Sequence, residues 1–245
     1  MIRLRRAELP TELSEHLAKK TDQLVRSRAD GRAARDKWTN ARTCKPGLRE
    51  HLGRMAAGID RCMYCGDSLG TDIDHFEPLF VSPLRAFEWP NHLLACSHCN
   101  SHEKRERFPL AGDGTPLLVD PTVEEPSERL LLVLSTGEYE ARTARGRATI
   151  EVFGLNRTSL VRGRRSAFVI TRSVLQAYLR QREDGLCAEA AETAAELECQ
   201  PFADVREAMR WTRTNVATQN AEIILGGPHV IRALDLLPPA AGSRS

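Results

Sequence analysis

Four cysteines of this sequence form two CxxC pairs, and each pair presents two thiols from one tight turn. The pairs are Cys62 with Cys65 and Cys96 with Cys99. Structural zinc takes four tetrahedral ligands and leaves no open position. The spacing therefore predicts one structural zinc site that joins two elements, with an incidental pair or a disulfide as the alternative. The remaining cysteines match no motif and are interpreted as buried or idle thiols: Cys44, Cys187 and Cys199.

An acid–histidine dipeptide, Asp74-His75, lies between the two cysteine pairs in the run TDIDHFEPLF. The alternation in this run is typical of a strand, in which neighbouring side chains point to opposite faces. The two residues can therefore serve one site only at a strand end or an irregularity. An asparagine precedes the second cysteine pair (Asn91), and another directly follows it (Asn100).

Taken in order, these residues resemble the HNH, or ββα-metal, nuclease family in the version that carries a four-cysteine zinc. The matching positions are the two CxxC pairs, Asp74-His75 with Pro78, Asn91 and Asn100. The match covers about a fifth of the chain and keeps the order and spacing of the family pattern. It implies a small zinc-stapled ββα-metal core.

The resemblance also implies definite roles. His75 would be the general base that activates water for attack on a phosphodiester. Asp74 and Asn100 would hold one divalent cation, Mg²⁺ or Mn²⁺, with His102 as the alternative to Asn100. Asn91 would fix the loop that orients His75. Basic residues after the second pair would contact the substrate backbone, with solvated charge as their alternative: Lys104, Arg105 and Arg107.

The flanking sequences carry a weaker resemblance to the HNH effectors of ATPase-coupled bacterial phage-defence systems, of the Septu type and of certain retrons. The segments concerned are FPLAGDGTPLLVDPTVEEPSERL and ARGRATIEVFGLNRTSLVRGRR. This resemblance implies an antiviral endonuclease that cuts DNA, with RNA as a further substrate. It also implies a partner ATPase that docks on the helical C-terminal half.

Two other functions fit parts of the pattern. A zinc-stabilised nucleic-acid-binding module without catalysis is the main alternative. A zinc deaminase is the other, because His75 and Glu77 followed by Cys96 and Cys99 superficially match its signature. Ala95 stands where that signature has proline, and the first cysteine pair would remain unexplained.

The composition is that of an ordinary soluble protein. The 245 residues can form one large domain or two small ones. A net charge of +2 does not by itself indicate a nucleic-acid partner. The N-terminus has no apolar run typical of a secretory signal, and no stretch approaches a membrane span. We therefore expect a cytoplasmic protein without a membrane partner, whose thiols serve metal or catalysis.

Hydrophobic periodicity predicts an α+β fold that is predominantly α-helical. Residues 1–60 are a basic helical N-terminal segment, 61–120 the nuclease core, 121–240 a β-hairpin plus a helical region, and 241–245 a disordered tail. The arginine-rich stretch around Trp38 is either a solvated helix face with one aromatic anchor or a surface that contacts nucleic acid. His92 is predicted on a helix surface.

Several single elements are also predicted. Helices are expected from Thr11, after Pro46, from Gly185 and from Pro201. Asn156 is expected to cap a further, long helix. The strand predictions comprise a short apolar strand, Leu117–Val119, and a hairpin built from 130–134 and 139–142.

Overall fold

The computed structural model describes residues 1–238, and most of them are helical. The strands within this range form two separate two-stranded antiparallel sheets. This confirms the predicted α+β class, with helices predominant. No helix among the described residues is long and apolar enough to cross a membrane. The predicted tail 241–245 lies outside the described residues.

Three helices begin the chain: α1 (Thr11–Arg26), α2 (Gly31–Asn40) and α3 (Lys45–Met55). They confirm the helices predicted from Thr11 and after Pro46. Asp30 caps α2, since its carboxylate accepts a hydrogen bond from the Ala33 backbone N–H (2.8 Å). Pro46 fits the first turn of α3, where the missing N–H would have no helical partner.

The first sheet pairs β1 (Asp72–His75) with β2 (His92–Ala95), and His75 lies opposite His92. The connection holds two short helical turns, η1 (Pro83–Phe87) and η2 (Trp89–Asn91). After β2 comes η3 (His98–Lys104), a π-helical segment. A π-helix has hydrogen bonds between residues five apart, and the Arg105 N–H accordingly donates to the Asn100 carbonyl (2.8 Å).

The second sheet is the predicted hairpin, formed by β3 (Leu130–Val133) and β4 (Glu138–Ala141) after the short turn η4 (Pro126–Glu128). The strand predicted at Leu117–Val119 is wrong. The Val119 N–H donates to the Thr149 hydroxyl (2.9 Å) instead of to a strand. Leu118 and Val119 are buried, so this apolar run packs into the core as irregular chain.

Helices form the rest of the described chain: α4 (Ala144–Val152), α5 (Thr158–Glu183), α6 (Cys187–Cys199), α7 (Ala203–Asn215), α8 (Thr218–Leu225) and α9 (Pro228–Leu236). The prediction that Asn156 caps α5 is wrong. Its side chain bonds the backbone N–H and carbonyl of Tyr139 (both 2.8 Å), so it ties the hairpin to the start of α5.

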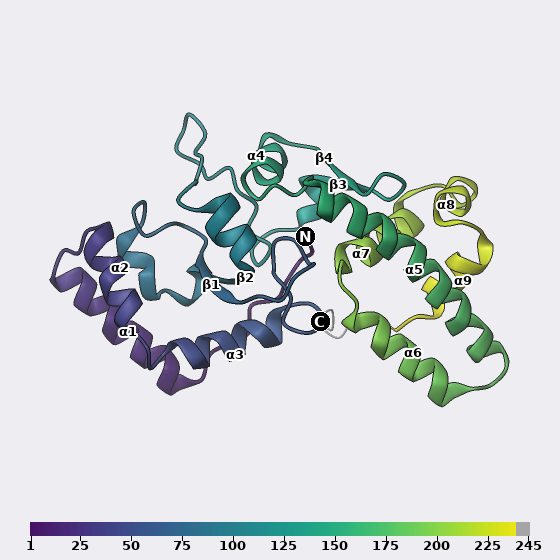
Figure 1. The fold of residues 1–245 in the computed structure, drawn as a ribbon, viewed down its shortest axis with the longest axis horizontal. Helices are drawn as coiled ribbons and strands as arrows, with labels where there is room; N and C mark the ends of the chain where they lie inside the picture. The colour runs from purple at the N-terminus through teal and green to yellow at the C-terminus, as the bar shows by residue number, and fades with distance from the viewer. Residues whose placement is uncertain (239–245) are drawn as a thin grey trace.

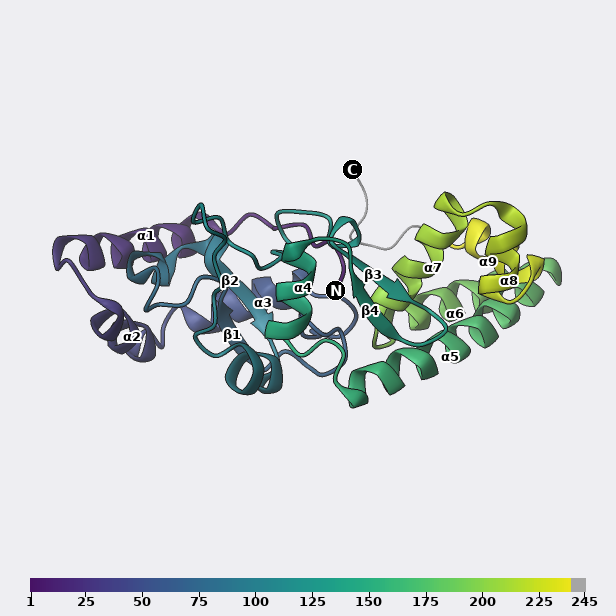
Figure 2. The same cartoon turned by 90° about the horizontal axis from the view of Figure 1, so that it is seen from above.

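Two hydrophobic clusters hold these elements together. The smaller one joins α1, α2 and α3 to η1 through buried residues such as Leu24, Leu48 and Phe87. The larger one extends from Leu4 through the cysteine pairs to the C-terminal helices. Figures 1 and 2 show α1 and α2 at one end of the molecule and α5 to α9 at the other, with β1, β2 and α3 between them. The first sheet is therefore supported from both sides.

Candidate active site and metal centre

The four cysteines of the two CxxC pairs come together as predicted. Their Sγ atoms all lie within 4.8 Å of one another, and all four residues are buried. The Cys65 and Cys96 sulfurs are 3.9 Å apart, close to the roughly 3.8 Å of two sulfurs on one tetrahedral zinc and far beyond the roughly 2.05 Å of a disulfide. The group can therefore hold one metal ion. It is the only cluster of three or more His, Cys, Asp or Glu side chains within residues 1–238 with this geometry.

Local backbone geometry brings the sulfurs together. Gly66, directly after the first pair, has φ +68°, a left-handed conformation that suits glycine. In the second pair the Cys99 N–H donates to the Cys96 sulfur (3.4 Å). Hydrogen bonds within the group lower the pKa of Cys65, while burial raises the pKa of Cys62, so the four thiols do not all ionise together without a metal ion.

Arg157 is a neighbour of this centre that the sequence did not reveal. Its guanidinium nitrogens lie 3.7 and 3.8 Å from the Cys99 sulfur. A positive charge at this distance offsets the negative charge of clustered thiolates. Arg157 belongs to no motif. It follows Phe153, whose ring stacks at 3.9 Å on Tyr64 of the first cysteine pair, and this contact brings the end of α4 to the cysteines.

His75 ends β1 and has a defined tautomer. Its Nε2 atom lies 3.0 Å from the Ala86 carbonyl oxygen. A carbonyl oxygen only accepts, so Nε2 carries the proton and Nδ1 has a free lone pair. Nδ1 has no partner among the described residues and is not sealed from solvent. Burial lowers the pKa of His75 to about 4, so its imidazole is neutral at neutral pH.

Asn91 fixes the loop that carries this carbonyl. It is fully buried. Its Oδ1 accepts from the Glu77 N–H (2.8 Å), and its Nδ2 donates to the carbonyls of Glu77 (3.1 Å) and Arg85 (3.2 Å). Arg85 precedes Ala86 in the chain. The arrangement is consistent with the role expected for Asn91, in which its amide positions the group that orients His75.

Trp38 and His92 complete the surroundings of His75. The Trp38 ring meets the His75 ring edge-on at 4.5 Å and stacks on the His92 ring at 5.0 Å. The prediction that His92 lies on a helix surface is wrong, because it is a fully buried residue of β2. Its Nε2 donates to the same Ala86 carbonyl (3.0 Å). An aromatic residue of the arginine-rich segment thus packs directly against the candidate base.

Asp74 faces away from His75, on the opposite side of β1. Both of its oxygens accept from the Lys104 ammonium (2.9 and 2.8 Å), and one also accepts from the Tyr64 hydroxyl. The Lys104 side chain is fully buried. Two expectations need correction here: Asp74 is occupied by an internal cation, and Lys104 cannot contact a substrate backbone in this conformation.

Asn100 does not meet Asp74. Its amide donates to Asp72 (3.1 Å), the next acid on the same face of β1. The alternative ligand His102 is exposed, and its ring lies 5.6 Å from the ring of His98, which contacts Glu103. The predicted ligands of a divalent cation are therefore not assembled, and the residues do not fit such an ion in this conformation.

The other two basic residues after the second cysteine pair are exposed. The Arg107 guanidinium donates to the carbonyls of Glu103 and Val152 (2.6 Å for the latter). Arg105 has φ 50° at the end of η3. Both side chains are accessible, and Arg107 has mainly structural contacts.

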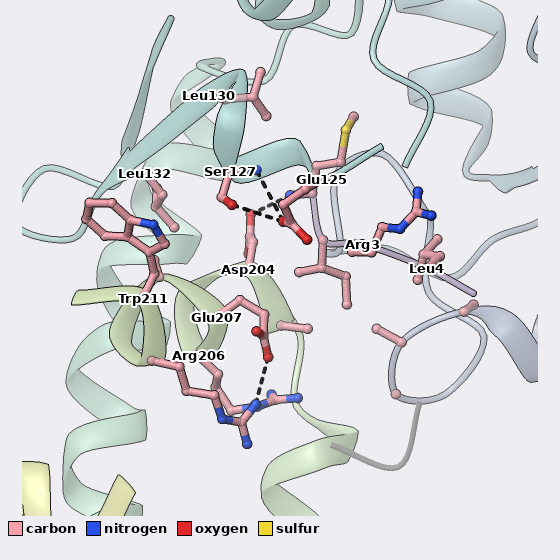
Figure 3. A pocket seen from close by; sticks show the side chains of 18 of the residues that line it. Arg3, Leu4, Glu125, Ser127, Leu130, Leu132, Asp204, Arg206, Glu207 and Trp211 are labelled. Atoms are coloured by element: carbon pink, nitrogen blue, oxygen red, sulfur yellow. Dashed lines mark hydrogen bonds and ion pairs between the residues drawn. The ribbon is translucent and has the colours of Figure 1, made fainter. Parts of the chain in front are cut away.

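A separate cavity lies away from His75 and the four cysteines. It measures about 840 Å³ and is lined by the N-terminal residues, the end of α3, β3 and α7. Figure 3 shows Arg3, Leu132 and Trp211 among its lining residues. Some of its charged residues form ion pairs, as Arg210 does with Glu207 (2.7 Å). No catalytic or metal-binding residue predicted from the sequence lines this cavity.

Comparison with protein-family models, with curated proteins and with solved structures found no match for this chain.

Proposed function

We propose that this chain is an endonuclease of the HNH type that hydrolyses phosphodiester bonds in DNA. One observation carries the proposal: a neutral histidine at the end of β1 donates Nε2–H to a carbonyl on an asparagine-fixed loop and keeps Nδ1 free. A general base needs this combination of fixed orientation and an available lone pair.

The scaffold supports the same proposal. The β1–β2 pair followed by η3 has the order of a ββα-metal core, and four clustered cysteines border it. Zinc is the metal that suits four buried thiolates. It would bind Cys62, Cys65, Cys96 and Cys99 and contribute folding free energy on the order of 10 kcal/mol. His75 is not part of this sulfur group, which disfavours the deaminase interpretation.

In the proposed reaction His75 takes up one proton. Nδ1 accepts it from a water molecule while the water oxygen bonds to phosphorus and the bond from phosphorus to the leaving oxygen breaks. The leaving oxygen keeps the electron pair of that bond and takes a proton from solvent water. The imidazolium formed is stabilised by its Nε2–H bond to Ala86, because hydrogen bonds from charged donors are stronger than neutral ones. Since Asp74 is held by Lys104, no step is assigned to a divalent cation.

Nicking of a supercoiled plasmid with Mg²⁺ or Mn²⁺ tests the proposal. We expect His75→Gln to lose roughly 100-fold or more of the activity, the usual contribution of a general base, while zinc content and folding persist. His92→Gln is the matched control, because His92 bonds the same carbonyl but its Nδ1 is sealed from solvent. Equal losses in both variants would refute the role of His75.

A second candidate is a zinc-stabilised nucleic-acid-binding module without catalysis. The ion pair between Asp74 and Lys104 favours it, because a carboxylate closed off by a buried lysine is not available to a cation. Nucleic-acid binding by a wild-type protein that cleaves neither DNA nor RNA with either metal would support this candidate.

The antiviral role and the partner ATPase are proposed on the flanking sequence resemblance alone. They predict that nicking by the purified chain rises when a cognate ATPase and ATP are added. Measuring cleavage of DNA and RNA with and without that ATPase tests both the partner and the substrate. Unchanged cleavage in its presence would count against the partnership.

A further inference from the structure

A small cavity lies on the same face of β1 as His75. It measures about 240 Å³ and is lined by Trp38, Lys45, Arg49, Thr71 and Ile73. Ile73 and His75 share a strand face, because alternate strand residues point the same way. Trp38 connects the two places, since its ring also lies 4.5 Å from the His75 ring. The cavity is therefore adjacent to the candidate base.

Two cationic side chains border this cavity without an acidic partner. The Lys45 ammonium lies 4.9 Å from the centre of the Trp38 ring and donates only to the Thr39 carbonyl (3.2 Å). The Arg49 guanidinium donates to the carbonyls of Gly70 (2.7 Å) and Thr71. Neither forms an ion pair with a carboxylate of residues 1–238, whereas Arg35, Arg54 and Arg85 each do.

These contacts set the two residues apart from an ordinary solvated helix face. Carbonyl bonds orient the cationic groups but leave their charge uncompensated. Arg49 is the more constrained of the two, because its guanidinium spans two consecutive carbonyls of the chain entering β1. An oriented pair of positive charges beside a cavity favours an anion with several oxygens, such as a phosphodiester.

We propose that Lys45 and Arg49 bind a backbone phosphate of nucleic acid next to His75, so that α2 and α3 form one wall of the substrate site. This inference rests on the proposed function for the choice of phosphodiester as the anion. It replaces the expectation that Lys104 contacts the substrate, and it gives the basic N-terminal helices a specific role.

Binding of a short fluorescein-labelled DNA duplex, followed by fluorescence anisotropy over a range of salt concentrations, tests the inference. All variants carry His75→Ala and no divalent metal is added, so cleavage does not interfere. We expect Lys45→Gln with Arg49→Gln to bind roughly tenfold more weakly and to lower the salt slope by about 0.9 per phosphate contact removed. An RNA duplex of the same sequence distinguishes the two nucleic acids.

The control is Arg180→Gln with Arg182→Gln, which removes the same charge from the far end of α5, where neither arginine has an ion pair in the described structure. Lys45→Gln alone is the second test, because Lys45 makes one carbonyl bond and its loss spares the Arg49 contacts. Zinc content and circular dichroism verify folding.

The outcomes separate this inference from the proposed function. Equal weakening in the α5 control, or no binding by the parent protein, overturns the inference even if the wild type nicks plasmid. Binding that depends on Lys45 and Arg49 in a chain that never cleaves upholds the inference and defeats the nuclease proposal.

Discussion

A single carbonyl oxygen, that of Ala86, organises the chemistry around His75. Two histidines from neighbouring strands donate to it, each at 3.0 Å. A carbonyl with two donors fixes two tautomers at once, but only His75 keeps a solvent-accessible Nδ1. The chemical difference between these histidines thus comes from exposure and not from hydrogen bonding.

The first prediction concerns acid stability. Burial lowers the pKa of His75 from 6.5 to about 4, so the unfolded chain takes up a proton before the folded protein does. The free energy of unfolding has its full value above about pH 6.5, where His75 is neutral in both states. It decreases by up to roughly 3 kcal/mol as the pH falls towards 4. Urea unfolding between pH 7 and 4 should show a flatter dependence for His75→Gln than for wild type.

The exposed His102 provides the comparison. His102→Gln should keep the wild-type dependence of unfolding free energy on pH. If His75→Gln also keeps it, then the His75 imidazole is hydrated in the folded protein and takes up its proton at the same pH as in the unfolded chain.

The second prediction concerns Asn91. Asn91→Ala removes three hydrogen bonds and leaves the Glu77 N–H without a side-chain acceptor. We expect a loss of about 2–4 kcal/mol of unfolding free energy and a drop in nicking activity, because the loop holding Ala86 loosens. Asn156→Ala is the control, since its two bonds to Tyr139 lie away from His75. Equal activity in the two variants would contradict the role of Asn91 in positioning.

At the scale of elements, the sequence predicted several of the long helices and the second hairpin, but it placed His92 on a helix instead of on β2 and left the faces of β1 undetermined. The CxxC spacing is a local signal and correctly predicted the sulfur cluster. The run around β1 has polar residues on both faces, so alternation alone did not indicate which face packs on η3. The structure places Asp72 and Asp74 against Asn100 and Lys104 of η3. This pairing depends on the π-helical turn, which no simple periodicity predicts.

The third prediction concerns that packing. Lys104→Met removes the cation from a buried carboxylate and should lower the unfolding free energy by about 3–5 kcal/mol. Combining it with Asp74→Asn should recover most of the loss, because no unpaired charge then remains. Chemical denaturation with and without Mn²⁺ adds a second readout, since a cation that can replace Lys104 would raise the stability of Lys104→Met alone. A fully stable single variant would show that the ion pair is not formed in solution.

The fourth prediction concerns the cysteine centre. The purified chain should contain one zinc ion, and Cys62→Ser should lose it together with much of the cooperative unfolding transition. Metal analysis by mass spectrometry and thermal unfolding measure both effects. Cys187→Ser should change neither, because Cys187 is exposed at the start of α6 and is not a member of the sulfur cluster. A metal-free wild type that unfolds at the same temperature as Cys62→Ser would exclude a structural metal.

At the scale of the whole molecule, the C-terminal helices attach to the rest of the protein through buried polar contacts as well as apolar ones. Asp204 of α7 accepts from the Tyr139 hydroxyl of β4 (2.7 Å) and from Arg164 of α5 (3.2 Å). Arg164 also donates to the carbonyls of Gly137 (3.1 Å) and Leu155 (2.8 Å). Such long-range contacts follow from tertiary packing, so helix periodicity located α5 and α7 without revealing this link.

The fifth prediction tests that link. Asp204→Asn leaves the fully buried Arg164 charge without a carboxylate, which should lower the unfolding free energy by about 3–5 kcal/mol. Asp235→Asn breaks the exposed pair with Arg213 (3.1 Å) and should lower it by less than about 1 kcal/mol. Below the melting temperature Asp204→Asn should keep its zinc and its nicking activity, since no contact of Asp204 involves His75 or the four cysteines. Loss of activity in a folded Asp204→Asn variant would instead mean that the C-terminal helices control the geometry around His75.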